Sequence, residues 1–229
     1  MARQLFELCG TDPARIFSPY CWRARMALAH KGLDFESVPW RFTETERLAF
    51  ASHDKVPVLL DGDRAVPDSW AIAQYLDEAY PAAPSLLHGA PQAYVFVAAW
   101  NDTVLQAGLA GLIVSDIPPL LAPEHAAYFV ESREKRFGRP LAEVTAGREA
   151  RLPAFRAGLQ PLRHALRGRD FLGGAAPDYA DYIVFGSFMW ARSVSPLPVI
   201  GADDALSPWR DRMLDLFEGM ARRAPCFDA

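Results

Sequence analysis

The spacing of apolar residues changes near residue 90, and this change limits the possible folds more than any other feature of the sequence. Before it, runs suited to β-strands, such as 3–9 and 35–40, alternate with stretches suited to helices, such as 18–33. From Ala93 onward, apolar residues recur at helical spacing, and no convincing strand run interrupts them. The sequence therefore predicts two dissimilar units, a mixed α/β unit followed by an all-helical one.

The order of elements in the first unit limits the folds that this unit can adopt. Two short apolar runs flank Asp61-Gly62, which is a hairpin signal, and the helix that follows them is predicted to end at Pro81. With segment 41–52 as a short helix or an irregular excursion, the order is β-α-β-(α)-β-β-α. This order predicts a thioredoxin-like domain over residues 1–82.

The second unit is predicted over residues 90–229, after a linker near 82–90 that is rich in proline and alanine. A chain of 229 residues has room for two small domains. Apolar residues fall at helical spacing in segments 94–114, 124–138, 141–168, 178–194 and 209–224.

Composition and charge argue against several classes of protein. The net charge of -4 differs from the basic excess that nucleic-acid-binding proteins usually carry. Three scattered cysteines are too few for a disulfide framework, which fits a reducing cytoplasm. The longest apolar region, 93–114, is interrupted by Asn101 and Asp102 and falls short of the ~18 residues of a membrane span. We therefore expect a cytoplasmic protein that binds neither nucleic acid nor membranes.

Ser18 stands at the head of helix 18–33, in the sequence Ser-Pro-Tyr-Cys. The free N–H groups and the dipole of a helix N-terminus favour an anion and lower the pKa of a thiol placed there. A serine hydroxyl can donate a hydrogen bond to a bound thiolate, whereas a cysteine would form a mixed disulfide with an incoming thiol. Serine is also a preferred helix cap, so capping alone could explain Ser18. Cys21, in the first turn, is either a residual redox thiol or, as we favour in the absence of a second cysteine, a small buried side chain.

The segment Lys55-Val56-Pro57-Val58 is a second candidate binding element. Pro57 has no N–H for a sheet ladder, so it belongs at a sheet edge or in a special turn. If the Val56-Pro57 bond is cis, the backbone groups of Val56 face the Ser18 helix and can pair with an extended peptide. An ordinary edge-strand proline is the alternative.

Asp68 and Ser69 open the next helix and form a third candidate element. Ser69 and the free N–H groups at the helix N-terminus can bind a carboxylate, and Asp68 can pair with an ammonium group. Together they suit the head group of an amino acid, which carries both charges. The alternative is that both residues only cap the helix.

In this order and spacing, the three stretches resemble the glutathione-binding domain of cytosolic glutathione transferases. The stretches are SPYCWRARMALAHKG, KVPVLL and DSWAIAQYLDEAYP. The second unit agrees, since GGAAPDYADYIVFG resembles the capping-box helix of that family, with Asp178 as cap and Asp181 three residues later. VPDSWAIAQYLDE and FGRPLAEVTAGREARLPAFRAGLQPLR are similar to the serine-type, etherase-like branch, which includes bacterial enzymes that cleave lignin β-aryl ethers and related fungal transferases.

The resemblance implies roles for individual residues. Ser18 would stabilise the thiolate, and Val56 would bind the cysteinyl backbone of glutathione. Asp68 and Ser69 would hold the γ-glutamyl end, and Arg41 could reach the glycine carboxylate. Pro57 would be the cis proline of the family. The candidate glutathione-binding residues are Ser18, Tyr20, Arg41, Val56, Pro57, Asp68 and Ser69.

The function expected from the resemblance is transfer of glutathione, as co-substrate and without a metal, to an apolar aromatic electrophile, with β-aryl ether cleavage as one form of it. The second substrate is expected in a cleft between the domains. The resemblance also implies a homodimer. Aromatic residues at helical spacing are more often core, but the candidates to line the acceptor pocket are Tyr20, Phe96, Trp100 and Trp190.

Three other readings stay open from the sequence. A glutathione-dependent reductase or lyase would use Cys21 as its thiol. A non-catalytic carrier would store aromatic compounds in the same cleft. A structural protein would keep the fold without glutathione, although the presence of Ser18 and the Asp68-Ser69 pair argues against this.

Overall fold

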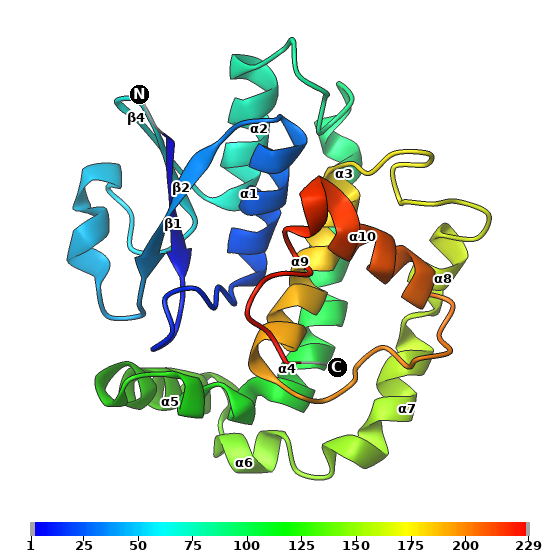
Figure 1. Cartoon of the computed structure of the whole chain (residues 1–229). Helices are drawn as coiled ribbons and strands as arrows, with labels where there is room; N and C mark the ends of the chain where they lie inside the picture. Colours follow the sequence, from blue (N-terminus) through cyan, green and yellow to red (C-terminus); the bar gives the residue numbers. More distant parts are fainter. Residues whose placement is uncertain (1–2, 228–229) are drawn as a thin grey trace.

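The computed structural model describes residues 3–227, and Figure 1 shows a mixed sheet with its helices beside a larger group of helices. The sheet has four strands in the order β2-β1-β3-β4. β1 (Arg3–Leu8) is parallel to β2 (Phe35–Trp40) and antiparallel to β3 (Val58–Asp61), and β4 (Arg64–Pro67) is antiparallel to β3. This topology confirms the predicted thioredoxin-like unit.

The two faces of the sheet are covered by different elements. Leu5 of β1 belongs to the main core, with α1 (Pro19–His30) and α2 (Ser69–Ala79). Phe6 points to the opposite face, because successive strand residues alternate, and packs with Leu48 of η1 (Thr45–Ala51). The uncertain segment of the sequence is thus a short 3₁₀ helix that covers the second face of the sheet.

Helices make up the second part of the chain, as predicted. The segment 141–168 is three helices and not one. The elements are α3 (Pro91–Trp100), η2 (Asn101–Leu105), α4 (Gln106–Ile113), η3 (Val114–Asp116), η4 (Pro118–Leu120), α5 (Pro123–Phe137), α6 (Leu141–Val144), α7 (Arg148–Gly158), α8 (Gln160–Ala165), α9 (Tyr179–Val194) and α10 (Ser207–Gly219).

The expected interruption of the apolar region at Asn101 and Asp102 does not occur. Both residues lie inside one helical run, Pro91–Asp116, in the π-helical turn η2. The run has 26 residues and a mean hydropathy of 1.3 in its most apolar window, so by length and composition it could span a membrane. Asn101 is buried and accepts a hydrogen bond from the Ser187 hydroxyl of α9 at 2.9 Å, so its polarity is satisfied within the protein.

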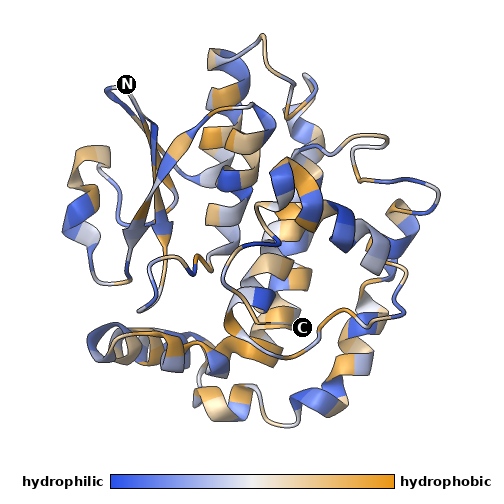
Figure 2. Ribbon diagram, viewed as in Figure 1, coloured by the Kyte–Doolittle hydropathy of each residue, from blue (hydrophilic) through white to orange (hydrophobic). Residues whose placement is uncertain are grey.

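Helix α9 lies at the centre of the molecule, and Figure 2 shows that it is largely hydrophobic. The capping box predicted at its start is present, with Asp178 accepting from helix amides and Asp181 accepting from the Asp178 amide at 3.2 Å. Further along, Gly186 touches the start of α1: a Cβ on Gly186 would lie 2.4 Å from the carbonyl oxygen of Pro19. The two parts of the chain therefore meet at the N-terminal end of α1.

The connection between the two parts is held by Asp77 of α2. Its carboxylate accepts from the amides of Leu86 (2.8 Å) and Leu87 (2.9 Å), from the Ser85 hydroxyl (3.0 Å), and pairs with Lys31 (2.6 Å). The predicted domain limits of 1–82 and 90–229 stay a prediction, but the linker between them is bonded to the first part at Ser85, Leu86 and Leu87.

Candidate functional site

Ser18 caps α1. Its backbone is extended (φ -74°, ψ 129°), Pro19 occupies the first helical position, and the Cys21 amide donates to Ser18 Oγ at 3.3 Å. Ser18 is only 5% exposed, so it is largely buried. The capping role expected of Ser18 is present, and the hydroxyl proton remains available to a ligand, since Oγ acts as acceptor in that bond.

Cys21 is fully buried on the inner side of the same turn. Its sulfur accepts a hydrogen bond from the Leu8 amide at 3.4 Å. Burial, with the negative charge of Glu7, raises the pKa of the Cys21 thiol to about 12. A thiol that is neutral at cellular pH and closed to solvent is a poor nucleophile, which argues against a Cys21-dependent reaction.

The loop before β3 carries the second candidate element. The Val56–Pro57 peptide bond is cis, and the Pro57 carbonyl accepts from the Asp68 amide at 3.1 Å. Within residues 3–227, the N–H and C=O of Val56 form no hydrogen bond. Main-chain groups of this kind can pair with an extended peptide.

Asp68 and Ser69 form the third element, at the start of α2. Asp68 has a positive φ of 75°, and its Oδ1 accepts from the amides of Trp70 (2.8 Å) and Ala71 (3.1 Å). Asp68 therefore caps the helix with one oxygen, while Oδ2 has no partner among the residues described. The Ser69 carbonyl accepts from the Tyr179 hydroxyl of α9 at 2.7 Å, which ties this turn to the helical part.

Tyr20 lies in a polar cluster between α1 and the π-helical turn. The Arg23 guanidinium stacks over the Tyr20 ring at 4.4 Å and lies 2.6 Å from Asp102 Oδ1. The same oxygen accepts from the side-chain amides of Asn101 (3.0 Å) and Gln106 (3.1 Å). Burial and the Asp102 carboxylate raise the pKa of Tyr20, so its phenol stays protonated at neutral pH.

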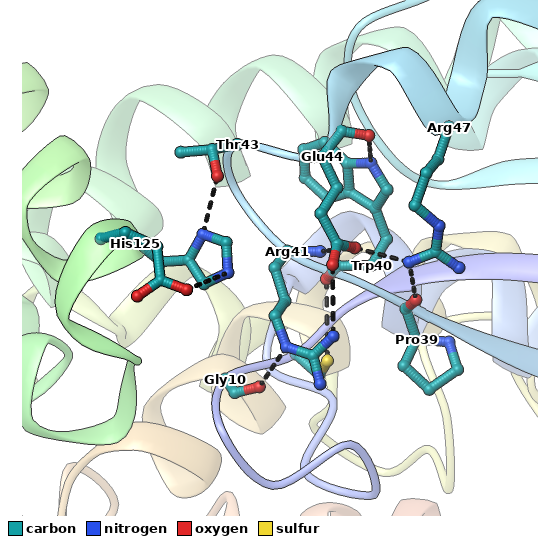
Figure 3. Close-up of polar contacts among 10 residues, drawn as sticks. Gly10, Pro39, Trp40, Arg41, Thr43, Glu44, Arg47 and His125 are labelled. Atoms are coloured by element: carbon teal, nitrogen blue, oxygen red, sulfur yellow. Dashed lines mark hydrogen bonds and ion pairs between the residues drawn. The ribbon is translucent and has the colours of Figure 1, made fainter.

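Figure 3 shows that Arg41 is already bonded within the protein. Its guanidinium donates to the Gly10 carbonyl (3.3 Å) and to Glu44 Oε1 (3.3 Å). Glu44 also pairs with Arg47, and nearby Thr43 meets His125 of α5 at 2.9 Å. An anionic ligand group at Arg41 would have to share this guanidinium with Glu44.

The predicted acceptor-pocket residues are not all brought together. Trp100 and Trp190 are half-buried and pack against the main core, while Tyr20 lies in the cluster described above. Phe96, in contrast, is 77% exposed on α3. This exposure argues against a pocket role for Phe96 and places its ring with Val95 on an uncovered side of the helix.

Sequence reasoning missed two residues that shape this region. Asp102 looks like a break in an apolar segment, yet a lone acid in such a segment is itself a sign of a buried or interfacial polar contact. Gly186, in the middle of the apolar helix α9, was not singled out. An isolated glycine at such a position usually has a packing reason, and the contact with Pro19 is that reason.

Comparisons with known proteins agree with this arrangement. Family models described as glutathione S-transferase, N-terminal domain, and glutathione S-transferase, C-terminal domain, match residues 14–84 and 92–211. The chain is 31% identical over 219 residues to the glutathione S-transferase-like protein ustS of Aspergillus flavus, covering 82% of this chain and 79% of that protein. A shorter match, 44% identical over 75 residues, covers 31% of this chain and 33% of glutathione S-transferase U13 of Arabidopsis thaliana.

Among solved structures, the chain is similar to the glutathione S-transferase CsGST83044 of Ceriporiopsis subvermispora, a structure in complex with glutathione. The TM-score is 0.75 at 23% identity, over 97% of this chain and 96% of that one. With both of its parts matched and one relative aligned over most of its length, the chain belongs to the glutathione S-transferase family of enzymes.

Proposed function

We propose that the protein transfers glutathione to an apolar aromatic electrophile, with the glutathione thiolate stabilised by Ser18 at the start of α1. The observation that carries this proposal is the Ser18 hydroxyl, which accepts from the Cys21 amide and so keeps its proton free for a sulfur at the helix N-terminus. A hydrogen bond and a helix dipole directed at one sulfur lower its pKa, and the thiolate is the nucleophilic form.

The rest of glutathione has matching groups in the same part of the chain. The cysteinyl backbone would pair with the free N–H and C=O of Val56, next to Pro57. The γ-glutamyl carboxylate would bind at Ser69 and the N-terminus of α2, and the ammonium group would pair with Asp68 Oδ2. The glycine carboxylate is assigned to Arg41, in competition with Glu44.

The reaction that follows from this arrangement is a substitution. The thiol proton leaves to solvent, the thiolate forms a carbon–sulfur bond with the electrophile, and the bond from that carbon to the leaving group breaks. The leaving group departs with the bonding electron pair. An aryl ether fits this scheme, with a phenolate as the leaving group, so ether cleavage of the etherase-like branch is one form of the same chemistry.

The acceptor site is proposed between the two parts of the chain, close to Tyr20, Trp100 and Trp190. Support comes from Tyr20, two residues after Ser18, whose ring is held by Arg23 and Asp102. The exposed apolar side chains of α3, Val95 and Phe96, support the proposed homodimer instead of the acceptor site.

A non-catalytic carrier of aromatic compounds is the alternative function, and it would use the same cleft without turnover. The reductase or lyase reading requires an accessible thiol, and the burial of Cys21 disfavours it. A cytoplasmic location is proposed because the three scattered cysteines fit a reducing compartment.

The test compares Ser18→Ala, Ser18→Asp and Cys21→Ala with the wild type, using glutathione and 1-chloro-2,4-dinitrobenzene. Asp is a good helix cap but repels a thiolate, so Ser18→Asp separates capping from thiolate stabilisation. We expect kcat/KM to fall about 100-fold in both Ser18 variants, as when one transition-state hydrogen-bond donor is removed. We expect it to change little in Cys21→Ala.

The pKa of the thiol of bound glutathione is measured by ultraviolet absorbance alongside the kinetics. The thiolate absorbs near 240 nm, and its pH titration in the wild type should lie below the pKa of about 8.5 of a free thiol. Normal turnover in Ser18→Asp would show that Ser18 only caps the helix. Tight binding of aromatic compounds without turnover in the wild type would support the carrier.

A further inference from the structure

A cluster of aromatic side chains with one arginine lies where the loop after β2 meets α5. We call Phe42, Tyr128, Phe129 and Arg133 the α5 patch. The Phe42 ring lies 5.3 Å from Phe129 and 6.2 Å from Tyr128, measured between ring centroids. The Arg133 guanidinium lies over both Phe129 (5.0 Å) and Phe42 (5.8 Å). Tyr128 is 46% exposed, and Phe42 and Arg133 are half-buried, so these three side chains are open to a ligand, whereas Phe129 is buried.

The α5 patch is connected to the proposed thiolate site through one residue. Phe17, which directly precedes Ser18, lies 6.1 Å from the Phe42 ring. The loop that carries Phe42 is held against α5 by the bond between Thr43 and His125, which Figure 3 shows. Figure 1 shows α5 beneath the end of the sheet where this loop emerges. The α5 patch is therefore packed, through Phe17, against the segment that leads into Ser18.

Arg133 differs from the other arginines of this region in its partners. Arg41 and Arg47 both pair with Glu44. Arg133 donates to the Ser132 hydroxyl at 2.9 Å, and no carboxylate within residues 3–227 lies within 4 Å of it. Burial and the neighbouring Arg136 charge lower the pKa of Arg133, which indicates a cation without local compensation. A partly desolvated guanidinium of this kind favours an anion, and it binds carboxylates through two parallel hydrogen bonds.

We propose that the acceptor site extends onto the α5 patch and takes an aromatic acceptor that carries a carboxylate, with Arg133 on the carboxylate and the Phe42 and Tyr128 rings against the aromatic ring. This proposal rests on the proposed transferase function and narrows its substrate class from apolar aromatics to aromatic acids. The carboxylate that binds Arg133 could belong to the acceptor or to the glycine end of glutathione. The test separates the two sources.

The experiment measures KM for two acceptors of matched shape, the anionic 4-chloro-3-nitrobenzoate and the neutral 4-chloro-3-nitrobenzamide, and for glutathione. The variants are Arg133→Gln and Arg133→Lys, with Arg136→Gln as the matched control on the same helix. We expect Arg133→Gln to raise KM for the benzoate about tenfold, the effect of losing a charge-assisted hydrogen bond. KM for the benzamide and for glutathione should stay within about twofold, and Arg133→Lys should recover part of the loss.

An unchanged KM for the benzoate in Arg133→Gln would overturn the proposal. A rise in KM for glutathione with no rise for the benzoate would overturn it as well, because it would assign Arg133 to the glycine carboxylate. An equal rise in KM for the benzoate in Arg136→Gln would also overturn it, because the effect would then come from the positive charge of α5 in general and not from Arg133.

Binding without reaction separates this proposal from the transferase function. Calorimetry measures the affinity of the protein for 3-nitrobenzoate and 3-nitrobenzamide. Both compounds lack a leaving group, so their binding to the α5 patch can be measured whether or not the protein is catalytically active. We expect tighter binding of the benzoate in the wild type and loss of that preference in Arg133→Gln. Absence of turnover with this preference intact would reject the transferase function alone. Equal binding of both compounds in the wild type would reject the patch.

Discussion

Arg23, in the second turn of α1, and Asp102 join the two parts of the chain, with 2.6 Å between Arg23 Nη2 and Asp102 Oδ1. The arginine side chain is 5% exposed and the aspartate 37%. The cation also stacks on Tyr20, so the pair determines the position of an aromatic ring beside the proposed thiolate. The first turn of α1 is therefore positioned from outside its own domain.

Asp102→Ala should destabilise the protein, because it leaves the Arg23 charge buried without a carboxylate. Removing one partner of a buried pair costs about 3–5 kcal/mol, and the partial exposure of Asp102 reduces the expected loss in the free energy of unfolding to about 2 kcal/mol. Urea denaturation measures it. Asp215→Ala, which breaks the exposed pair with Arg222, is the control and should leave the urea midpoint unchanged. Equal midpoints for the two variants would contradict the prediction.

Gly186→Ala should destabilise the protein and lower its activity, because the added Cβ would lie 2.4 Å from the Pro19 carbonyl oxygen and force α1 away from α9. Overpacking of this kind costs about 1–3 kcal/mol. Gly158→Ala is the matched control, since Gly158 ends helix α7 with no atom near its Cβ position. The control should be neutral or slightly stabilised. Thermal unfolding and kcat/KM measure both variants, and a stable, fully active Gly186→Ala would disprove the close contact.

Asp77→Asn should weaken the linker, and its effect should depend on pH. Burial acts to raise the pKa of Asp77, but hydrogen bonds from Leu86, Lys31 and Leu87 outweigh it and hold the pKa below the ordinary value of 3.8. A carboxylate with a lowered pKa stabilises the folded state above pH 3.8, and this contribution is lost as pH falls through the lower, folded-state pKa. The substitution also replaces one carboxylate oxygen by an NH2 group, which cannot accept the hydrogen bond from the Leu86 or Leu87 amide.

The measurement for Asp77→Asn is urea denaturation between pH 2.5 and 7. The variant should be less stable than the wild type by about 1–3 kcal/mol at pH 7, and the gap should close below about pH 4. The exposed neighbour Glu78→Gln serves as control. A gap that is constant over the whole range would mean that the charge of Asp77 contributes nothing.

Phe96→Glu should convert the protein to a monomer if α3 is the contact between two copies. Phe96 is 77% exposed, and a charge on an apolar face opposes burial of that face against a second copy. Sedimentation velocity measures the oligomeric state, with circular dichroism to verify the fold. Tyr128→Glu, an exposed aromatic on α5, is the control and should keep the wild-type state. A monomeric wild type would remove the basis for the homodimer.

Features that depend on neighbouring residues in the chain could be predicted from the sequence. Ser18 with Pro19, Asp68 and the Asp178 box all act within one turn of their own helix, and each caps that helix as its local pattern indicates. The thioredoxin-like fold of the first part could be predicted from the order of short elements in the first 80 residues, a pattern that few folds share.

Features that depend on distant contacts could not be predicted. Asn101 and Asp102 looked like a break because their partners, Ser187 and Arg23, are 86 and 79 residues away in the sequence. The α5 patch combines Phe42 with side chains more than 80 positions later, and no local spacing reveals that meeting. Phe96 was assigned to a pocket by residue type, whereas its exposure depends on how α3 is rotated.

The missing side chain at Gly186 has a consequence for recombining this chain with its relatives. The first part contains α1, whose opening carbonyl at Pro19 needs an empty position on α9, so the two parts are matched to each other at that point. A chimera that joins residues 1–82 to the helical part of another family member would keep its activity only where the new partner also has glycine there. That one position gives a simple criterion for choosing which halves to exchange.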